Sequence, residues 1–327
     1  MTLTKLAQLA GVSVSTVSKA LSESAEISEG TRAAIVALAK EHGCYEKYYN
    51  PKYQKKLIAV LCPEILGNHY GRMANDMEHE IAAHGGTMVL SVFGFRAEKQ
   101  RELVEYYTKF ARADGIIVIE PAEKVKNDTD IPIVQIGPEN ESRGVDCVKA
   151  ELAPAMEEAV RYLRKLGHRR IGFVGEELAT PEYEAFLETV RRARLEILPG
   201  HVAVSSARFE EAGRDAMGKI LSTGDELPTA VFAAYSHIAL GTRRFLLEKG
   251  LSVPRDMSII CMDDILSDTY QWGDLSCIRM HIGELCASAT ELLFAKLRKG
   301  HGRTKRSVSV IREFSHGDTV APPVEKT

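Results

Sequence analysis

Few residues of this chain stand in patterns that support catalysis. A helical zinc-protease motif needs two histidines four residues apart, whereas His79 and His84 are five apart, so we interpret this segment as a solvated helix face. Asp263 and Asp264 follow an apolar run and are more typical of a ligand-binding acid or a helix cap than of a catalytic pair. Phosphate-binding glycine loops and the G-x-S-x-G nucleophile elbow are missing. The sequence therefore predicts that the protein is not an enzyme and has no catalytic residue, cofactor or metal site.

The most informative residues lie near the start of the chain, where the sequence predicts two short helices joined by a turn. Apolar residues at i, i+3, i+4 and i+7 give the first helix one buried face. These residues are Leu3, Leu6, Ala7 and Ala10. Gly11 follows, where a left-handed residue ends a helix, and Ser13 is placed to cap the next one. The second helix is expected to bury Val17, Ala20 and Leu21.

The outward face of the second helix carries small or hydroxylated side chains and one cation. These are Val14, Ser15, Thr16, Ser18 and Lys19. Small side chains let a helix approach the DNA major groove closely, hydroxyls reach phosphates and bases, and a lysine approaches guanine acceptors. The spacing by itself is equally compatible with an amphipathic hairpin that packs on the rest of the fold.

The stretch from Leu6 to Lys19, LAQLAGVSVSTVSK, followed by ISEGTR at 27–32, resembles the DNA-binding head of the lactose-repressor (LacI/GalR) family of transcriptional regulators. The resemblance implies a three-helix helix-turn-helix head whose second helix reads DNA. It assigns base reading to Val14, Ser15 and Lys19, and backbone contacts to Thr16 and Ser18. The family usually has an arginine where Lys19 stands, and lysine lacks the planar fork that binds guanine through two hydrogen bonds.

Further DNA contacts are expected around this helix. A third helix is predicted from Ser28 to about His42. Residues 45–56 are polar, basic and tyrosine-rich, with Pro51 blocking a regular helix, and are interpreted as a linker whose lysines either contact phosphates or belong to a solvated tether. The Ala-rich, Leu-bearing hinge helix that the family uses to kink the minor groove is missing. The remaining candidate DNA contacts are Thr4, Ser28, Lys47 and Lys52.

Composition and charge exclude several other classes of protein. The chain has 327 residues, of which 45% are hydrophobic and 27% charged, as in ordinary globular proteins of two or three domains. It shows no membrane-spanning apolar run and no signal-peptide layout, so a cytoplasmic location is expected. The six cysteines form no C-x-x-C pair. The net charge is −3, yet residues 1–56 carry +3, so a basic head precedes an acidic body.

From Leu57 onward, short apolar runs alternate with amphipathic stretches. Strands are predicted at 57–62, 87–93, 115–119, 131–136, 144–149, 170–174, 201–204, 230–234 and 258–262. Helices are predicted at 70–85, 99–113, 153–166, 181–194, 209–221 and 238–249. This alternation predicts an α/β fold with two doubly wound parallel sheets, each covered by helices on both faces. Ligands of such sheets bind beyond the carboxyl ends of the strands, which here means the cleft between two lobes.

This region also resembles the LacI/GalR family, notably in DGIIV at 114–118, LGHRRIGFVG at 166–175 and VPRDMSIICMDD at 253–264. The resemblance implies a periplasmic-binding-protein-like core of two lobes joined by three crossovers. Lobe 1 is expected at about 57–152 and 283–300, and lobe 2 at about 153–282 and 301–317. The last strand, near 307–311, thus falls in lobe 2. The expected domains are a head at 1–44, a linker at 45–56, a core at 57–317 and a flexible tail at 318–327.

Sugar-binding members of the family hold their ligand through four polar positions in the cleft, and only one is kept in this chain. Asp263 retains the acid, Glu182 replaces an arginine, and Tyr235 and Ser236 replace an Asn-Asp pair. The acidic cleft favours a ligand with amines or many hydroxyls, and aromatic side chains are available for stacking. The candidate effector-binding residues are Tyr70, Glu182, Tyr235, Ser236, Asp263 and Trp272.

These patterns predict a homodimeric, sequence-specific transcriptional regulator, and a repressor in the first place. It would bind near-palindromic DNA and respond to a small molecule, sugar-like or amine-bearing, in the cleft. One alternative is a cytoplasmic small-molecule-binding protein whose head binds DNA only weakly. Another is a core that binds no ligand and serves only as a scaffold for the dimer.

Overall fold

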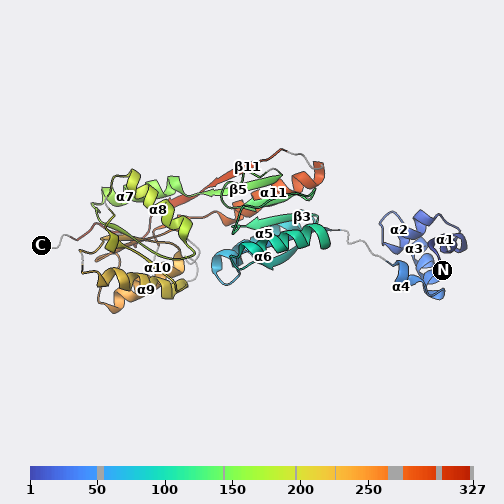
Figure 1. Cartoon of the computed structure of the whole chain (residues 1–327), viewed down its shortest axis with the longest axis horizontal. Helices are drawn as coiled ribbons and strands as arrows, with labels where there is room; N and C mark the ends of the chain where they lie inside the picture. The colour runs from blue at the N-terminus through green and yellow to red at the C-terminus, as the bar shows by residue number, and fades with distance from the viewer. Residues whose placement is uncertain are drawn as a thin grey trace. The chain divides into compact units, whose positions relative to one another are not determined.

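The computed structural model describes residues 1–49, 55–142, 144–195, 197–224, 226–263, 275–299 and 304–324. The chain forms two compact units, a head at Met1–Lys56 and a core at Leu57–Thr327 (Figure 1). Within the described ranges, no helix is long and apolar enough to cross a lipid bilayer.

The head contains three helices around a small apolar core. They are α1 (Leu3–Ala10), α2 (Val14–Leu21) and α3 (Glu29–Glu41). Gly11 ends α1 in the left-handed conformation with φ 66°, and the Ser13 hydroxyl caps α2 by accepting from the Thr16 N–H at 3.0 Å. Both features agree with the sequence analysis. The buried residues are Leu6, Ala7, Val17, Ala20, Leu21, Ile35, Ala39 and Cys44.

The segment interpreted as the start of the linker belongs to the head instead. Residues 45–48 form a short helix, α4 (Tyr45–Tyr48), so the expected boundary at Tyr45 is wrong. The Tyr48 hydroxyl donates to the Met1 carbonyl at 2.9 Å, and the Tyr49 hydroxyl donates to Glu23 at 2.6 Å. The tyrosines pack because each offers an apolar ring and a polar tip. Residues 50–54 lie outside the described part of the chain.

Lobe 1 of the core is a six-stranded sheet in the order β11-β5-β4-β3-β1-β2. Its strands are β1 (Lys56–Cys62), β2 (Gly86–Val92), β3 (Gly115–Ile119), β4 (Ile133–Ile136), β5 (Val145–Glu151) and β11 (Ser307–Ile311). Alternate residues of β1 enter two different apolar clusters: Ile58 and Val60 pack with α5 (Asn68–Ala83) and α11 (Ile282–Lys299), whereas Ala59 and Leu61 pack on the other face. That second face is covered by α6 (Ala97–Glu105) and its π-helical extension Tyr106–Phe110. Burial on both faces explains why the strands are continuously apolar.

Lobe 2 is a second six-stranded sheet in the order β12-β10-β9-β8-β6-β7. Its strands are β6 (Ile171–Glu176), β7 (Val202–Ser205), β8 (Ala230–Ala233), β9 (Ser258–Cys261), β10 (Cys277–Arg279) and β12 (Glu313–Ser315). Its α-helices are α7 (Ala153–Lys165), α8 (Thr180–Arg192), α9 (Phe209–Ser222) and α10 (Ser236–Glu248). Helices α9 and α10 touch backbone to backbone at two glycines. A Cβ at Gly213 would lie 2.1 Å from the Ile238 carbonyl oxygen, and a Cβ at Gly241 would lie 1.9 Å from the Glu210 carbonyl oxygen, so neither position has room for a side chain.

The chain crosses between the lobes three times, and the third crossover differs from the expectation. As expected, α11 returns to lobe 1, where it packs against α5. Strand β11, however, also lies in lobe 1, where it pairs in parallel with β5 from Ser307 opposite Cys147 to Ile311 opposite Glu151. A strand that follows a helix on one face of a sheet returns to that same sheet. The crossover to lobe 2 therefore comes after β11, and only the short β12 joins β10 there.

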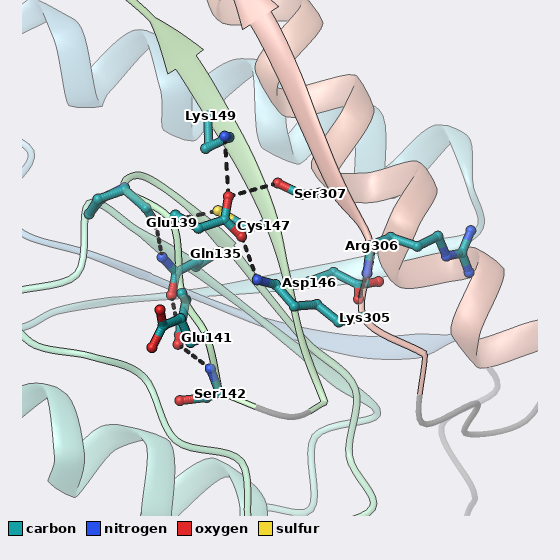
Figure 2. Close-up of polar contacts among 12 residues, drawn as sticks. Gln135, Glu139, Glu141, Ser142, Asp146, Cys147, Lys149, Lys305, Arg306 and Ser307 are labelled. Atoms are coloured by element: carbon teal, nitrogen blue, oxygen red, sulfur yellow. Dashed lines mark hydrogen bonds and ion pairs between the residues drawn. The ribbon is translucent and has the colours of Figure 1, made fainter.

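Polar contacts at the edge of lobe 1 fix β11 in this position (Figure 2). Glu139 accepts hydrogen bonds from the Ser307 hydroxyl at 3.1 Å and pairs with Lys149 at 3.2 Å and with Lys305. Asp146, which is fully buried, accepts from the Arg306 N–H at 2.9 Å and pairs with Lys296 of α11 at 2.7 Å. Both ends of the link from α11 to β11 are thus tied to the β4–β5 region.

The segment after Gly317 is held against lobe 2, so the prediction of a flexible tail is wrong for residues 318–321. The Thr319 hydroxyl donates to the Ile259 carbonyl at 2.7 Å and accepts from the Ser276 N–H at 3.0 Å. The Ala321 carbonyl accepts from the buried His168 ring at 2.9 Å. These bonds supply partners for backbone groups of β9 and Ser276, where the recorded pairing of β10 with β9 does not extend, and this explains why a proline-rich segment is ordered.

We predict that Thr319→Val lowers the free energy of unfolding by about 2 kcal/mol, because the Ile259 carbonyl and the Ser276 N–H lose a buried partner. Denaturant titration of the full chain measures the change. Thr180→Val is the matched control, since the Thr180 hydroxyl donates to the Glu177 carbonyl at an exposed site and its loss is expected to cost under about 0.5 kcal/mol. Equal effects of the two substitutions would show that the tail does not stabilise lobe 2.

Candidate functional site

The outward face of α2 is built as the sequence predicted. Val17 and Ala20 are buried in the head core, which turns Val14, Ser15 and Ser18 toward solvent. Val14 exposes 42% of its surface. The Thr16 hydroxyl lies 2.9 Å from the capping Ser13 hydroxyl, so the cap also orients this candidate contact.

The remaining candidate DNA contacts of the head are spread over several elements. Thr4 is exposed on α1, and Ser28 is exposed and caps α3 by accepting from the Thr31 N–H at 3.3 Å. Lys47 is exposed on α4, with its ammonium 5.1 Å from the centre of the Tyr48 ring. Lys52 lies outside the described residues.

Lys19, the cation of α2, is engaged within the head. Its ammonium forms an ion pair with Glu26, which lies in the turn before α3. The hydrogen bond from Lys19 lowers the pKa of Glu26, so the acid is ionised at neutral pH. The side chains remain 43% and 68% exposed, and an exposed pair of this kind is weak enough to exchange for a phosphate or a base.

In the core, acidic side chains gather where the parallel strands of the two lobes end. Glu120 directly follows β3, and Glu176 is the last residue of β6. Glu64 and Asp263 each lie two residues beyond the end of a strand, β1 and β9 respectively. Glu64, Glu176 and Asp263 are buried, whereas 41% of the Glu120 side chain is exposed. We call these four acids and the residues that contact or electrostatically couple to them the interlobe cluster.

Arg208 bridges the two lobes. It precedes α9 in lobe 2, and its guanidinium donates to both carboxylate oxygens of Glu64 in lobe 1, at 2.9 and 3.2 Å. Its Nε donates to Glu176 at 2.7 Å, and its guanidinium carbon lies 4.7 Å from the centre of the Phe209 ring. Burial by itself would lower the pKa of Arg208, but the bond to Glu64 and the charge of Glu176 raise it. One guanidinium thus neutralises two buried carboxylates from opposite lobes.

A groove of about 370 Å³ opens beside this bridge. It is lined by Leu66 of lobe 1 and by Arg208, Phe209, Glu210, Glu211 and His237 of lobe 2. The candidate effector residue Tyr235 contacts Phe209. The Phe209 backbone N–H donates to the Tyr235 hydroxyl at 3.2 Å. Burial and the neighbouring Glu176 raise the pKa of Tyr235.

Glu120 joins two aromatic neighbours from the start of α5. The Tyr70 hydroxyl donates to one of its oxygens at 2.5 Å, and the His69 ring lies 3.2 Å from the other. Burial would lower the pKa of His69, but the hydrogen bond and charge of Glu120 outweigh it, so the pKa is raised from 6.5. Burial would likewise raise the pKa of Glu120, but His69 and Tyr70 lower it to about 2.

Asp263 and Ser236 meet at the start of α10. The Ser236 N–H donates to Asp263 Oδ1 at 2.9 Å, and the Cys261 thiol lies 3.4 Å from the same oxygen. Burial raises the pKa of Asp263 even though these bonds oppose the shift. Asp263 therefore caps a helix, one of the two roles expected for it. Glu182, in the first turn of α8, also has a pKa raised by burial, and the charge of Glu120 adds to the shift.

The structure thus gathers most, though not all, of the candidate effector residues. Tyr70, Glu182, Ser236 and Asp263 belong to one electrostatically coupled group, whereas Tyr235 lies at the Arg208 bridge. Trp272 lies outside the described residues. The sequence analysis missed the remaining members of the cluster, which are Glu64, His69, Glu120, Glu176, Arg208 and Arg312. Position at a strand end, the rule that found Asp263, would also have found Glu120 and Glu176, but no sequence pattern pointed to Arg208.

Comparisons with known proteins cover both units. Residues 2–46 match the family described as bacterial regulatory proteins, lacI family, and residues 160–320 match a periplasmic binding protein-like domain. The chain is 28% identical over 319 residues to the HTH-type transcriptional repressor PurR of Pasteurella multocida (strain Pm70), covering 91% of this chain and 92% of the relative. It is 28% identical over 320 residues to the repressor CytR of Escherichia coli (strain K12), covering 92% and 91% respectively.

Solved structures show the same fold. A LacI-family regulator from Silicibacter pomeroyi superposes with a TM-score of 0.76 at 22% identity, over 98% of this chain and 99% of that one. The Lac repressor dimer bound to operator and the anti-inducer ONPF gives a TM-score of 0.74 at 19% identity, over 98% and 99%. The two-lobed architecture expected from the sequence is therefore confirmed.

We predict that Arg208→Met lowers the free energy of unfolding by roughly 2–3 kcal/mol, because it leaves Glu64 and Glu176 buried without a counter-charge. Chemical denaturation at neutral pH measures the loss. Arg214→Met is the matched control: Arg214 makes two 2.6 Å bonds to Glu248, but both side chains are half exposed, so the expected loss is under about 1 kcal/mol. If Arg208→Met costs no more than the control, the bridge does not hold the lobes together.

We predict that the stabilisation lost in His69→Asn depends on pH. The raised pKa of His69 contributes stability that is fully present below pH 6.5. This stability is lost as the pH rises through the pKa of His69 in the folded protein. The lowered pKa of Glu120 contributes stability above 4.5 that disappears as the pH falls toward about 2. The difference in unfolding free energy between wild type and variant is therefore expected to be largest from pH 4.5 to 6.5 and smaller at pH 9. A difference that grows toward alkaline pH would contradict the His69–Glu120 pairing.

Proposed function

The chain belongs to the lacI family of bacterial regulatory proteins, and from this membership we propose that it represses transcription by binding operator DNA through its head under the control of a small effector. The two relatives named above are also transcriptional repressors. The proposal places the protein in the cytoplasm and assigns it regulation rather than catalysis.

The observation that carries the proposal is the exposed face of α2. A capped helix with its apolar residues buried presents Val14, Ser15, Ser18 and Lys19 to solvent. Helix-turn-helix proteins insert a helix of this kind into the major groove, where short side chains permit close approach. In the proposal, Val14, Ser15 and Lys19 read bases, and Thr16, Ser18, Thr4, Ser28 and Lys47 contact the backbone.

Binding as a dimer follows from the modest charge of one head. A net charge of +3 over residues 1–56 neutralises few phosphates, and phosphate contacts supply much of the affinity of DNA-binding proteins. Two heads on one dimer read two half-sites, which makes the operator a near-palindrome. The Lac repressor structure that resembles this chain holds a dimer bound to operator.

The effector is proposed to act at the interlobe cluster. Tyr70, Glu182, Ser236 and Asp263 are the proposed contacts, with Tyr235 at the neighbouring bridge. A ligand that binds two lobes in one relative arrangement better than in another shifts the population of the two arrangements. Because Arg208 links the lobes, its bonds to Glu64 are the contacts that such a shift would alter.

One observation favours the second candidate function, a small-molecule-binding protein with weak DNA binding. The ion pair with Glu26 satisfies Lys19 inside the head, so binding a base requires this pair to break. Selection of binding sites from random DNA by the full chain separates the two functions. A repressor is expected to enrich a near-palindromic motif with affinity that falls steeply with salt. Failure to enrich any motif would favour the second candidate.

On the selected sequence, we predict that Lys19→Ala weakens binding about tenfold, as for loss of one base contact, without unfolding the head. Glu26→Gln is expected to strengthen binding severalfold, because it frees Lys19 and removes a negative charge beside α2. Glu41→Gln, at the end of α3, makes the same change in charge and is the control. If Glu26→Gln and Glu41→Gln have equal effects, only net charge matters. If Lys19→Ala and Ser15→Ala both leave specific binding unchanged, α2 is not the reading helix.

A further inference from the structure

Arg312 is a buried arginine that the structure leaves largely without partners. It directly follows β11, on the crossover to lobe 2, and nine-tenths of its surface is buried. Its backbone N–H donates to the Glu151 carbonyl at 3.0 Å, but the one recorded hydrogen bond of its side chain is long, from a terminal guanidinium nitrogen to the Met262 carbonyl at 3.4 Å. Its Nε is buried and has no hydrogen-bond partner.

Among the described residues, no ion pair explains this burial. Glu182, Glu120 and Asp263 are close enough to raise the pKa of Arg312, although burial lowers it further. Yet within the described part of the chain, no carboxylate oxygen lies within 4.0 Å of the guanidinium. A buried charge with unfilled hydrogen-bonding capacity is costly, so a group that the described residues do not supply is expected between Arg312 and these acids.

A second orphaned group lies beside Asp263. Ser236 is 2% exposed, and its hydroxyl makes no hydrogen bond of good geometry, although it lies close enough to Asp263 to lower the pKa of that acid and the Ser236 N–H is bound to Asp263. Arg312 comes from the end of β11 and Ser236 from the start of α10, so the two orphans belong to different elements. Both are tied to the carboxyl end of β9, Arg312 through Met262 and Ser236 through Asp263.

The remaining bonding capacity of the cluster defines what fits. Both oxygens of Glu120 are used by His69 and Tyr70, and the recorded bonds of Asp263 fall on Oδ1. The guanidinium of Arg312 and the hydroxyl of Ser236 therefore still need hydrogen-bond acceptors. The carboxylates of Asp263 and Glu182 still need donors. An apolar ligand would leave these groups unsatisfied, and an anion would be repelled by the three surrounding carboxylates.

We propose that Arg312 and Ser236 are ligand-binding residues, and that their ligand is a small molecule without net negative charge that offers an acceptor oxygen beside hydroxyl or amine donors. The acceptor binds Arg312 and Ser236, and the donors bind Asp263 and Glu182. Neutral polyols and zwitterions share this chemistry, whereas phosphorylated compounds do not. The inference rests on the effector site of the proposed function, which already includes Ser236, and it adds Arg312 to the contacts and excludes anionic compounds from the ligand class.

The test measures binding to the full chain by thermal shift and calorimetry, with three groups of probes. They are neutral sugars and nucleosides, zwitterionic amino acids, and sugar phosphates. A compound from one of the first two groups is expected to bind. The group to which it belongs shows whether the acceptor oxygen comes from a neutral polyol or from a zwitterion. The proposal is overturned if sugar phosphates bind best or if no probe of the first two groups binds.

Variants assign the binding to these residues. Arg312→Gln and Ser236→Ala are each expected to weaken the binding of that compound about tenfold or more, as for loss of a buried hydrogen bond to a charged group or a hydroxyl. Arg255→Gln, at an exposed arginine paired with Asp256, is the control and should leave affinity unchanged. Ser236→Ala keeps the test decisive if Arg312→Gln does not fold. Unchanged affinity in Ser236→Ala and in any folded Arg312 variant would mean that only water fills the site.

Operator binding by the same proteins separates this inference from the proposed function. Without added ligand, Arg255→Gln should bind the selected operator like wild type, because Arg255 belongs neither to the head nor to the interlobe cluster. If wild type binds operator but none of the neutral or zwitterionic probes, the inference fails and the repressor proposal stands. If wild type binds such a probe through Arg312 but no DNA sequence, the repressor proposal fails and the inference about the ligand survives.

Discussion

A buried carboxylate needs a counter-charge or hydrogen-bond donors, and this requirement governs how the two lobes meet. Parallel strands place their carboxyl ends at one edge of each sheet, and in this chain those ends carry the buried Glu64, Glu176 and Asp263 and the partly exposed Glu120. Arg208 satisfies two of them across the lobes, while His69 and Tyr70 satisfy the third. Asp263 takes the N–H at the start of α10. The contact that Arg208 makes with Glu64 across the lobes is therefore charge-assisted on both sides.

The head follows a different logic, because its stability and its proposed function use separate faces of the same helix. Val17, Ala20 and Leu21 bury one side of α2 in the small core, and the Ser13 cap closes its first turn. The opposite side is then free of packing constraints, and it is the side to which the proposed function assigns DNA reading. The ion pair between Lys19 and Glu26 is the one recorded restraint on the charged end of that face within the described residues.

Much of the fold was predictable because local patterns agree with the tertiary structure. The apolar spacing of α1, Gly11 and Ser13 predicted the head, and the alternating runs predicted two covered parallel sheets. The errors lie where chain-distant partners decide the outcome. Tyr48 and Tyr49 fold back on Met1 and Glu23, Thr319 bonds to the backbone of β9 in lobe 2, and β11 pairs with β5 rather than joining lobe 2. A short polar or proline-rich segment has no periodicity that reports such contacts.

By itself, the sequence determined the class of protein, the helix that faces outward in the head, and Asp263 as a polar group at a strand end. These depend on spacing and on residues close in the chain, so one sequence carries them. Only the tertiary structure decided which charges meet. Arg208 lies 144 residues from Glu64 and Arg312 lies 50 residues from Met262, yet each pair is in hydrogen-bond contact. Such meetings are fixed by the crossovers and by the burial of both sheets, because desolvated groups take whichever partners the packed lobes bring within reach.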